Sequence, residues 1–199
     1  MFRVIRRARA ATPLLLLVLL LTGCGTTRIV PPLDPRDPVS VFVLDHGRHT
    51  SLVLPAPDGS LHRYAYGDWR YYAERDTGAA SGLAALLWST PGALGHRRMP
   101  GPATAEAVRA QVGVVIVELH NLRVERQRVE RLRTRLDALI AQAEHRLETP
   151  EVDLVFVPYP DGYHLGHNSN QMLADWLVEL GCEVSRRPVR AGWQVEAAQ

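Results

Sequence analysis

Short apolar runs rich in β-branched and aromatic residues recur along the chain, at residues 39–44, 50–54, 61–66, 112–119 and 152–157. Runs of this length and composition predict buried strands. The segment Pro55-Ala-Pro-Asp-Gly-Ser60 between the second and third runs is a turn sequence, so these two runs predict a β-hairpin. A final run at 189–195 predicts an edge strand.

Apolar residues at three- and four-residue spacing predict two longer helices. One covers residues 124–147, and the other covers 170–180, where Gly181 ends it. A short apolar helix is expected over 79–88, ended by Pro91-Gly92. The order of hairpin, helix, strand, helix, strand and helix predicts an α+β fold in which helices pack on an antiparallel sheet.

The N-terminus predicts a secretory signal followed by a lipid anchor. Four arginines precede an apolar run at 13–21, which ends in Leu21-Thr-Gly-Cys24. This ending resembles the lipobox of bacterial lipoproteins, which implies cleavage before Cys24, diacylglycerol on its sulfur and usually an acyl group on its amine. The alternatives are an ordinary signal peptide and a retained membrane helix. The apolar run is shorter than the roughly 20 residues that span a bilayer, which disfavours the helix.

These features divide the chain into three parts: a signal peptide at 1–23, a lipid-anchored tether at 24–38 and one domain at 39–199. Four prolines in the middle part predict an extended tether. The expected location is the cell envelope, with the lipid in the outer membrane and the domain facing the periplasm. Gly25 stands where an aspartate commonly retains lipoproteins at the inner membrane.

Charge and cysteine content exclude some classes of partner. The net charge of +2 includes the four signal arginines, so the remainder carries −2 and indicates no nucleic-acid partner. With Cys24 lipidated, Cys182 has no partner for a disulfide and is expected to be a buried structural thiol. No cofactor is indicated.

Two polar segments could hold a reactive site. Asp45-His46-Gly47-Arg48-His49 precedes the second strand, and Gly162–Gln171 precedes the last helix. Asn168, Ser169 or Asn170 is a natural N-cap for that helix, and a reactive Ser169 hydroxyl is the alternative interpretation. The residues expected to bind a ligand around the site are His46, Tyr66, Trp69, His167, Asn168 and Asn170.

The hairpin suggests a partner for one histidine. A turn centred between Asp58 and Gly59 pairs His49 with Asp68, close enough for the carboxylate to orient the imidazole. His62, the competing partner, then lies opposite Pro55. A metal site built from His46, His49, His164 and His167 is not expected, because they lack helical i,i+4 spacing and acidic or cysteine companions.

Several motifs resemble those of a family of bacterial envelope lipoproteins with no assigned function. The stretch His46-Gly-Arg-His49-Thr-Ser-Leu-Val-Leu54 resembles its H-G-x-H-T-x-L-V strand. Gly67-Asp68-Trp69-Arg70-Tyr71-Tyr72 and Leu87-Trp88-Ser89-Thr90-Pro91 match two further elements, and Asn168-Ser169-Asn170 lies where the family has N-T-C-N. The resemblance covers most of residues 39–185.

Such proteins are similar to circularly permuted papain-like enzymes of the NlpC and lecithin:retinol acyltransferase type. The resemblance implies that His49 is the general base, that Asp68 is its orienting partner and that Ser169 occupies the nucleophile position. The chain departs from the pattern because serine replaces cysteine, and because His167 stands where asparagine is usual. His164 and His167 leave a different arrangement around Ser169 open.

Two functions are therefore expected as alternatives. One is an acyl hydrolase or acyltransferase that acts on peptide, amide or lipid ester bonds in the envelope. The other is an inactive lipoprotein that binds peptidoglycan, peptide or lipid in the residual cleft. A plain structural spacer would explain the tether but not the histidine-rich segments.

Overall fold

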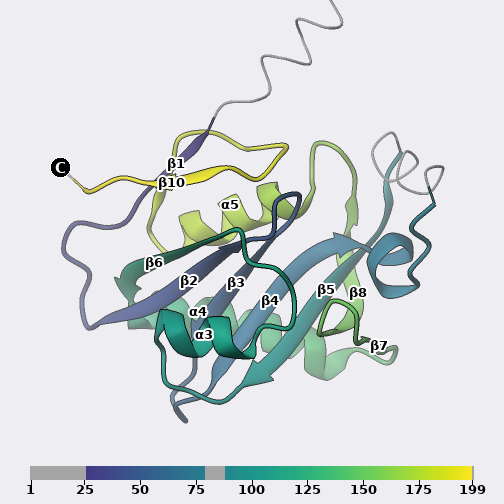
Figure 1. Cartoon of the computed structure of the whole chain (residues 1–199), viewed down its shortest axis with the longest axis horizontal. Coiled ribbons are helices and arrows are strands. Elements are labelled where there is room, and N and C mark those ends of the chain that lie inside the picture. Colours follow the sequence, from purple (N-terminus) through teal and green to yellow (C-terminus); the bar gives the residue numbers. More distant parts are fainter. Residues whose placement is uncertain (1–25, 79–87, 199) are drawn as a thin grey trace, which may run out of the picture.

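The computed structural model describes residues 26–78 and 88–198. The predicted signal, Cys24 and nearly all of the predicted helix at 79–88 lie outside these residues. The described part is an α+β structure with mostly antiparallel pairing (Figure 1).

A seven-stranded antiparallel sheet forms the centre of the structure, in the order β6-β2-β3-β4-β5-β8-β7. Its strands are β2 (Pro38–Asp45), β3 (Thr50–Pro55), β4 (Leu61–Asp68), β5 (Thr90–Met99), β6 (Glu118–Glu125), β7 (Leu147–Thr149) and β8 (Leu154–Tyr163). The strands predicted at 39–44, 50–54 and 61–66 are confirmed as the main parts of β2, β3 and β4.

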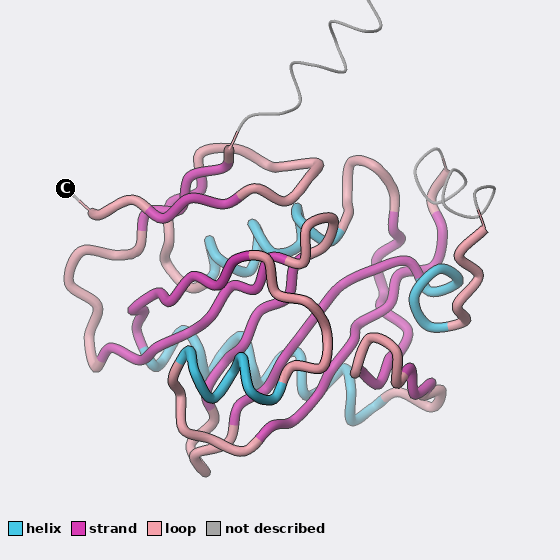
Figure 2. Tube along the Cα trace, in the orientation of Figure 1, coloured by secondary structure: helices cyan, strands magenta, loops and turns pink. Residues whose placement is uncertain are grey.

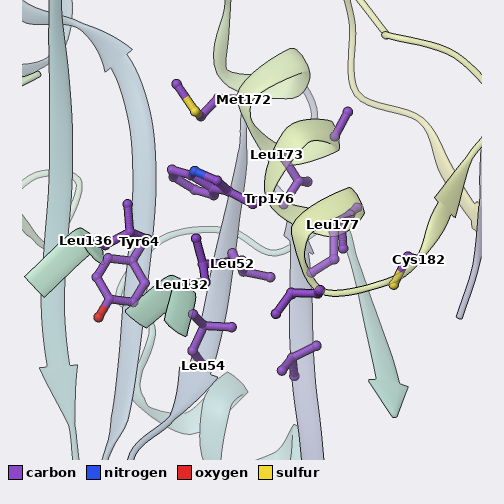
Figure 3. Close-up of a cluster of buried hydrophobic side chains, with 14 of the residues drawn as sticks. Leu52, Leu54, Tyr64, Leu132, Leu136, Met172, Leu173, Trp176, Leu177 and Cys182 are labelled. Atoms are coloured by element: carbon purple, nitrogen blue, oxygen red, sulfur yellow. The ribbon is translucent and has the colours of Figure 1, made fainter. Parts of the chain in front are cut away.

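Helices cover both faces of this sheet: α3 (Ala105–Gln111) on one face, and α4 (Arg126–Gln142) and α5 (Ser169–Glu179) on the other (Figure 1). Alternate strand residues face the two layers. Leu52 and Tyr64 belong to the cluster that includes α4 and α5, whereas Val53 and Leu61 belong to the cluster around α3. In the larger cluster, Trp176 of α5 packs with leucines of β3 and α4 (Figure 3).

A second, three-stranded sheet joins the two ends of the described chain. β1 (Thr27–Val30) lies between β9 (Glu183–Val184) and β10 (Trp193–Val195) (Figure 2). Ile29 is fully buried in the larger hydrophobic cluster. The expectation of an extended tether through residue 38 is therefore wrong for 27–30, which are part of the folded structure.

The two longer predicted helices are both present, one nearly as expected and one shorter. The helix expected at 170–180 is α5, and Gly181 follows it with a φ of 90°. The helix expected over 124–147 is shorter, because Val124 belongs to β6 and the helix occupies only Arg126–Gln142.

The strand predicted at 112–119 is wrong, since the pairing with β2 begins only at Glu118. Val112, Val114 and Ile116 do pack against the α3-side cluster, whereas Val115 and Val117 are exposed. The β-branched residues that predicted a strand therefore pack on one side of a segment that pairs with no strand before Glu118.

Both β5 and α3 went unpredicted. β5 contains Pro91, Gly92 and Gly95 and has no β-branched residue after Thr90, so its composition does not indicate a strand. Both glycines leave room for neighbouring groups. A Cβ at Gly92 would overlap Asp161 and Tyr66, and a Cβ at Gly95 would overlap Phe156. Helix α3 is short, and its start is marked only by the Thr104 side chain, which accepts from Ala107 N.

Candidate functional site

Ser169 is the first residue of α5, and its neighbour Asn168 caps the helix. Asn168 Oδ1 accepts from the backbone N–H groups of Asn170 (2.9 Å) and Gln171 (3.2 Å). The Gln171 side chain accepts in return from Asn168 N at 3.1 Å, which completes a capping box. Ser169 is only 3% exposed. Because Asn168 is the N-cap, the Ser169 hydroxyl is not needed to cap the helix.

His49 lies in the loop between β2 and β3 and faces the start of α5. A hydrogen bond from His46 N to His49 O (2.9 Å) closes the loop, with Gly47 at a φ of 91°. His49 Nδ1 lies 3.5 Å from Ser169 Oγ. For the hydroxyl to donate to Nδ1, the imidazole must carry its proton on Nε2.

Burial, with His46 and Arg48 nearby, lowers the pKa of His49 to about 4. The imidazole is therefore neutral at pH 7 and free to accept a proton.

Asn170 fixes the His49 loop to the helix. Its Oδ1 accepts from the Thr50 hydroxyl at 3.2 Å, and its Nδ2 donates to Arg48 O at 3.4 Å. Nδ2 also lies 3.3 Å from Val189 O. Because Arg48 and Thr50 flank His49, these bonds set the position of the imidazole relative to Ser169.

The expected pairing of His49 with Asp68 is wrong. The hairpin pairs Ser51 with Ala65 and Pro55 with Leu61, one residue out of the predicted register. Asp68 is buried, and its carboxylate accepts from Tyr71 N at 2.7 Å and from the Thr90 hydroxyl. It caps the π-helical turn at Trp69–Ala73.

Tyr72, from that turn, contacts His49 instead. The two rings meet edge to face, with centroids 4.8 Å apart and an interplanar angle of 88°. A Cβ at Gly67 would overlap the Tyr72 ring, so the glycine leaves room for this contact. Tyr72 was not predicted as a site residue, and its only signal was the aromatic Gly67–Tyr72 motif.

The helix start also offers a hydrogen-bond donor. The N–H groups of Asn170 and Gln171 are taken by Asn168. Among the described residues, the Ser169 N–H has no acceptor. An amide at a helix N-terminus favours negative charge, so this N–H is suited to an oxyanion formed beside Ser169 Oγ.

A cavity of about 120 Å³ lies beside His49. Its wall is largely apolar, and the lining residues are His46, His49, Thr50, Arg63, Ala65, Tyr66, Tyr72, Val114, Val152, Leu154 and Phe156. Its size fits a short acyl chain or a side chain rather than a large ligand.

Arg63 places a positive charge in the wall of this cavity. The side chain is 3% exposed, and Nε donates to Ser51 Oγ (3.1 Å) while Nη1 donates to Val152 O (3.3 Å). In the described part of the chain no carboxylate pairs with it. Burial lowers the pKa of Arg63 to about 10, which leaves it charged at neutral pH.

His46 contacts Arg63 and Ser51 rather than Ser169. Its Nδ1 donates to Val115 O at 2.7 Å, so Nε2 is an acceptor, 2.9 Å from Ser51 Oγ and 3.4 Å from Arg63 Nη2. Burial lowers the pKa of His46, which keeps it neutral.

The other two predicted binding residues, His167 and Trp69, have hydrogen-bond partners away from Ser169. His167 Nδ1 lies 2.9 Å from Gly162 O and 3.1 Å from Tyr66 Oη, which itself donates to Asp161 O at 3.1 Å. Trp69 Nε1 donates to Glu74 at 2.9 Å. The structure thus brings His49, Ser169 and Asn170 together and puts His46 and Tyr66 at the cavity wall. His167 contacts Gly162 and Tyr66, and Trp69 bonds to Glu74.

Cys182 is a buried free thiol, 4% exposed, and burial raises its pKa to about 12. Such a thiol stays protonated and is a poor nucleophile.

No protein-family model, curated protein or solved structure matches the chain. Within residues 26–78 and 88–198, no helix is both long and apolar enough to cross a membrane.

Proposed function

We propose that this chain is a lipid-anchored envelope protein with a papain-like domain, and that Ser169 and His49 catalyse acyl transfer or hydrolysis. The observation that carries the proposal is the 3.5 Å approach of Ser169 Oγ to His49 Nδ1 at the start of a capped helix. The pair joins residues that are 120 positions apart in the sequence. Lipidation of Cys24 would hold this site at the outer membrane, facing peptidoglycan, peptides and lipids.

In the proposed reaction, Ser169 Oγ attacks the acyl carbon of an amide or ester while its proton moves to His49 Nδ1. The Ser169 N–H donates to the oxyanion of the tetrahedral intermediate. Collapse of that intermediate breaks the bond to the leaving group, which takes the proton from His49. Water, or an acceptor alcohol or amine, then releases the acyl group by the same steps in reverse order.

Two features make this pair weaker than a complete triad. No carboxylate is hydrogen-bonded to His49 in the described residues, so only packing against Tyr72 and the loop bonds orient the ring. An imidazole with a pKa near 4 is also a weak base for a serine hydroxyl. We therefore expect slow turnover, because both the acylation of Ser169 and the release of the acyl group depend on this base.

These same features favour a second function, the binding of an envelope component without catalysis. The buried Arg63 charge in the cavity wall supports it, because an apolar cavity with one cation suits an acyl or peptide ligand that bears an anionic group. Catalysis requires Ser169 to form a covalent bond with the acyl group, whereas the binding function does not.

Covalent labelling distinguishes the two functions. The full chain, purified in detergent, is treated with a fluorophosphonate probe, and the labelled residue is identified by mass spectrometry. We expect labelling of Ser169 in the wild type and a loss of at least tenfold in both Ser169→Ala and His49→Ala. The matched control is Ser89→Ala, which removes an exposed serine and should label normally.

The Ser169→Cys variant tests the site itself, because a thiolate needs less activation than a hydroxyl. Rapid reaction of Ser169→Cys with a thiol probe, combined with an unlabelled wild type, would contradict serine catalysis and support the binding function. Labelling that survives His49→Ala would contradict the role of His49 as base.

A further inference from the structure

A second polar cluster lies on the face of the sheet that α4 covers, formed by His62 of β4, His96 of β5 and Asp137 of α4. All three residues are partly buried. His62 lies four residues before the cavity residue Tyr66 on the same strand, roughly 13 Å along it. The cluster is therefore separate from Ser169 and His49, and no role in acyl transfer accounts for it.

The separations within the cluster match those of metal ligands. His62 Nδ1 lies 3.1 Å from His96 Nε2 and 3.4 Å from Asp137 Oδ1, and all three ligand atoms lie within 4.8 Å of one another. Ligand atoms bound at 2.0–2.1 Å around a tetrahedral zinc ion are about 3.3 Å apart. The three atoms, one from each of three elements, thus lie close enough together for one ion to bind all of them.

His62 Nδ1 has more polar neighbours than one ring nitrogen can bond. Tyr64 Oη lies 3.2 Å from His62 Nδ1, so three polar atoms surround one nitrogen. That nitrogen carries either one hydrogen or one lone pair and satisfies one good hydrogen bond. A cation among the three ligand atoms would satisfy all of them at once.

Asp137 is held in the orientation that a ligand requires. Tyr64 Oη donates to its Oδ1 at 2.5 Å, and Arg133 Nη1 donates to its Oδ2 at 2.9 Å. Oδ1 keeps a second lone pair for an ion. Figure 3 shows the Tyr64 hydroxyl pointing away from Trp176 and out of the hydrophobic cluster. Such outer hydrogen bonds commonly position metal-binding carboxylates.

We propose that His62, His96 and Asp137 form a binding site for a divalent transition-metal ion, zinc being the best match. Two imidazole nitrogens and one carboxylate oxygen suit zinc better than magnesium or calcium, which prefer oxygen ligands. A bound ion would tie α4 to the adjacent strands β4 and β5.

Titration of the full chain with zinc tests the site. The protein is prepared in detergent, without a polyhistidine tag and after treatment with a chelator, and binding is followed by calorimetry. We expect one Zn²⁺ per chain with a micromolar or tighter Kd, and no binding of Mg²⁺. His96→Gln should weaken the affinity at least tenfold, whereas His145→Gln, which changes an exposed histidine, should not alter it.

Cobalt provides a second measurement, because Co²⁺ in such a site gives visible absorption bands that zinc then displaces. Circular dichroism of the metal-free variants checks folding, and Asp137→Asn replaces His96→Gln if that chain does not fold. The proposal is overturned if the wild type shows no saturable zinc binding. It is equally overturned if His96→Gln or Asp137→Asn binds as the wild type does, or if His145→Gln loses as much affinity.

Discussion

The chemistry of His49 is set by its surroundings more than by its residue type. A solvent-exposed imidazole has a pKa near 6.5, but burial against Tyr72 and the start of α5 lowers the pKa of His49 to about 4. The same burial brings Nδ1 to Ser169 Oγ. The position that makes His49 a candidate base therefore also makes it a weak one.

This pKa predicts a loss of stability in acid. Below pH 6.5 the unfolded chain protonates His49 but the folded chain does not, so the free energy of unfolding should fall as the pH drops from 6.5 to 4. Above pH 6.5 His49 contributes no pH dependence. Proton–carbon NMR of the histidine rings should show a His49 midpoint near pH 4, and a midpoint near 6.5 would contradict the burial seen here. Urea unfolding at pH 5 and 7 should show a smaller difference for His49→Gln than for the wild type.

Among the elements, α5 combines a capping box with Ser169, the proposed nucleophile. The Asn168 side chain makes four hydrogen bonds. Its Oδ1 accepts from two backbone N–H groups of α5, and its Nδ2 donates to Leu165 O and Val189 O. It thereby holds the loop before α5 and the segment after β9 around Ser169. The helix supplies the site with a fixed backbone direction and with the Ser169 N–H, which no acceptor in residues 26–78 and 88–198 occupies.

Loss of the cap should therefore destabilise the protein measurably. Asn168→Ala is expected to lower the free energy of unfolding by about 1–2 kcal/mol, because it removes the helix cap. Asn121→Ala, which changes an exposed asparagine on β6, should alter it by less than about 0.5 kcal/mol. Urea unfolding followed by circular dichroism measures both. Equal effects of the two variants would show that the capping box contributes little.

At the scale of the whole molecule, the N-terminal segment is integral to the fold. β1 pairs with β9 and β10, so the start of the described chain is held against its end. Only Gly25 and Thr26 separate Cys24 from Thr27, the first residue of β1. A lipid on Cys24 would therefore keep the domain close to the membrane surface rather than on a long tether.

Ile29 tests whether β1 stabilises the domain. Its side chain is fully buried, so Ile29→Ala should lower the free energy of unfolding by about 2–5 kcal/mol. Leu33→Ala, four residues later, changes a side chain that is 72% exposed and should have little effect. Thermal unfolding compares the two, and similar midpoints for both variants would mean that β1 is a loosely attached tether.

Features that depend on neighbouring residues could be predicted from the sequence. Short runs with β-branched or aromatic residues located β2, β3 and β4. The spacing of apolar residues located α5, and the polar residues before that helix marked Ser169. The sequence motif at 46–54 marked His49, the histidine that lies beside Ser169 in the structure. Strand propensity, helix periodicity and N-capping act over a few residues, so a single sequence reveals them.

Contacts between groups far apart in the chain became known only from the folded structure. The β3–β4 hairpin has a register one residue away from the predicted one, so Asp68 does not pair with His49. Asp68 instead caps the π-helical turn at Trp69–Ala73, and Tyr72 of that turn contacts His49. The glycine-rich β5 became a central strand because Tyr66 and Phe156 pack onto its glycines, and it brought His96 to His62. Pairing register and side-chain packing depend on contacts between segments far apart in the chain, and no local pattern of residues specifies them.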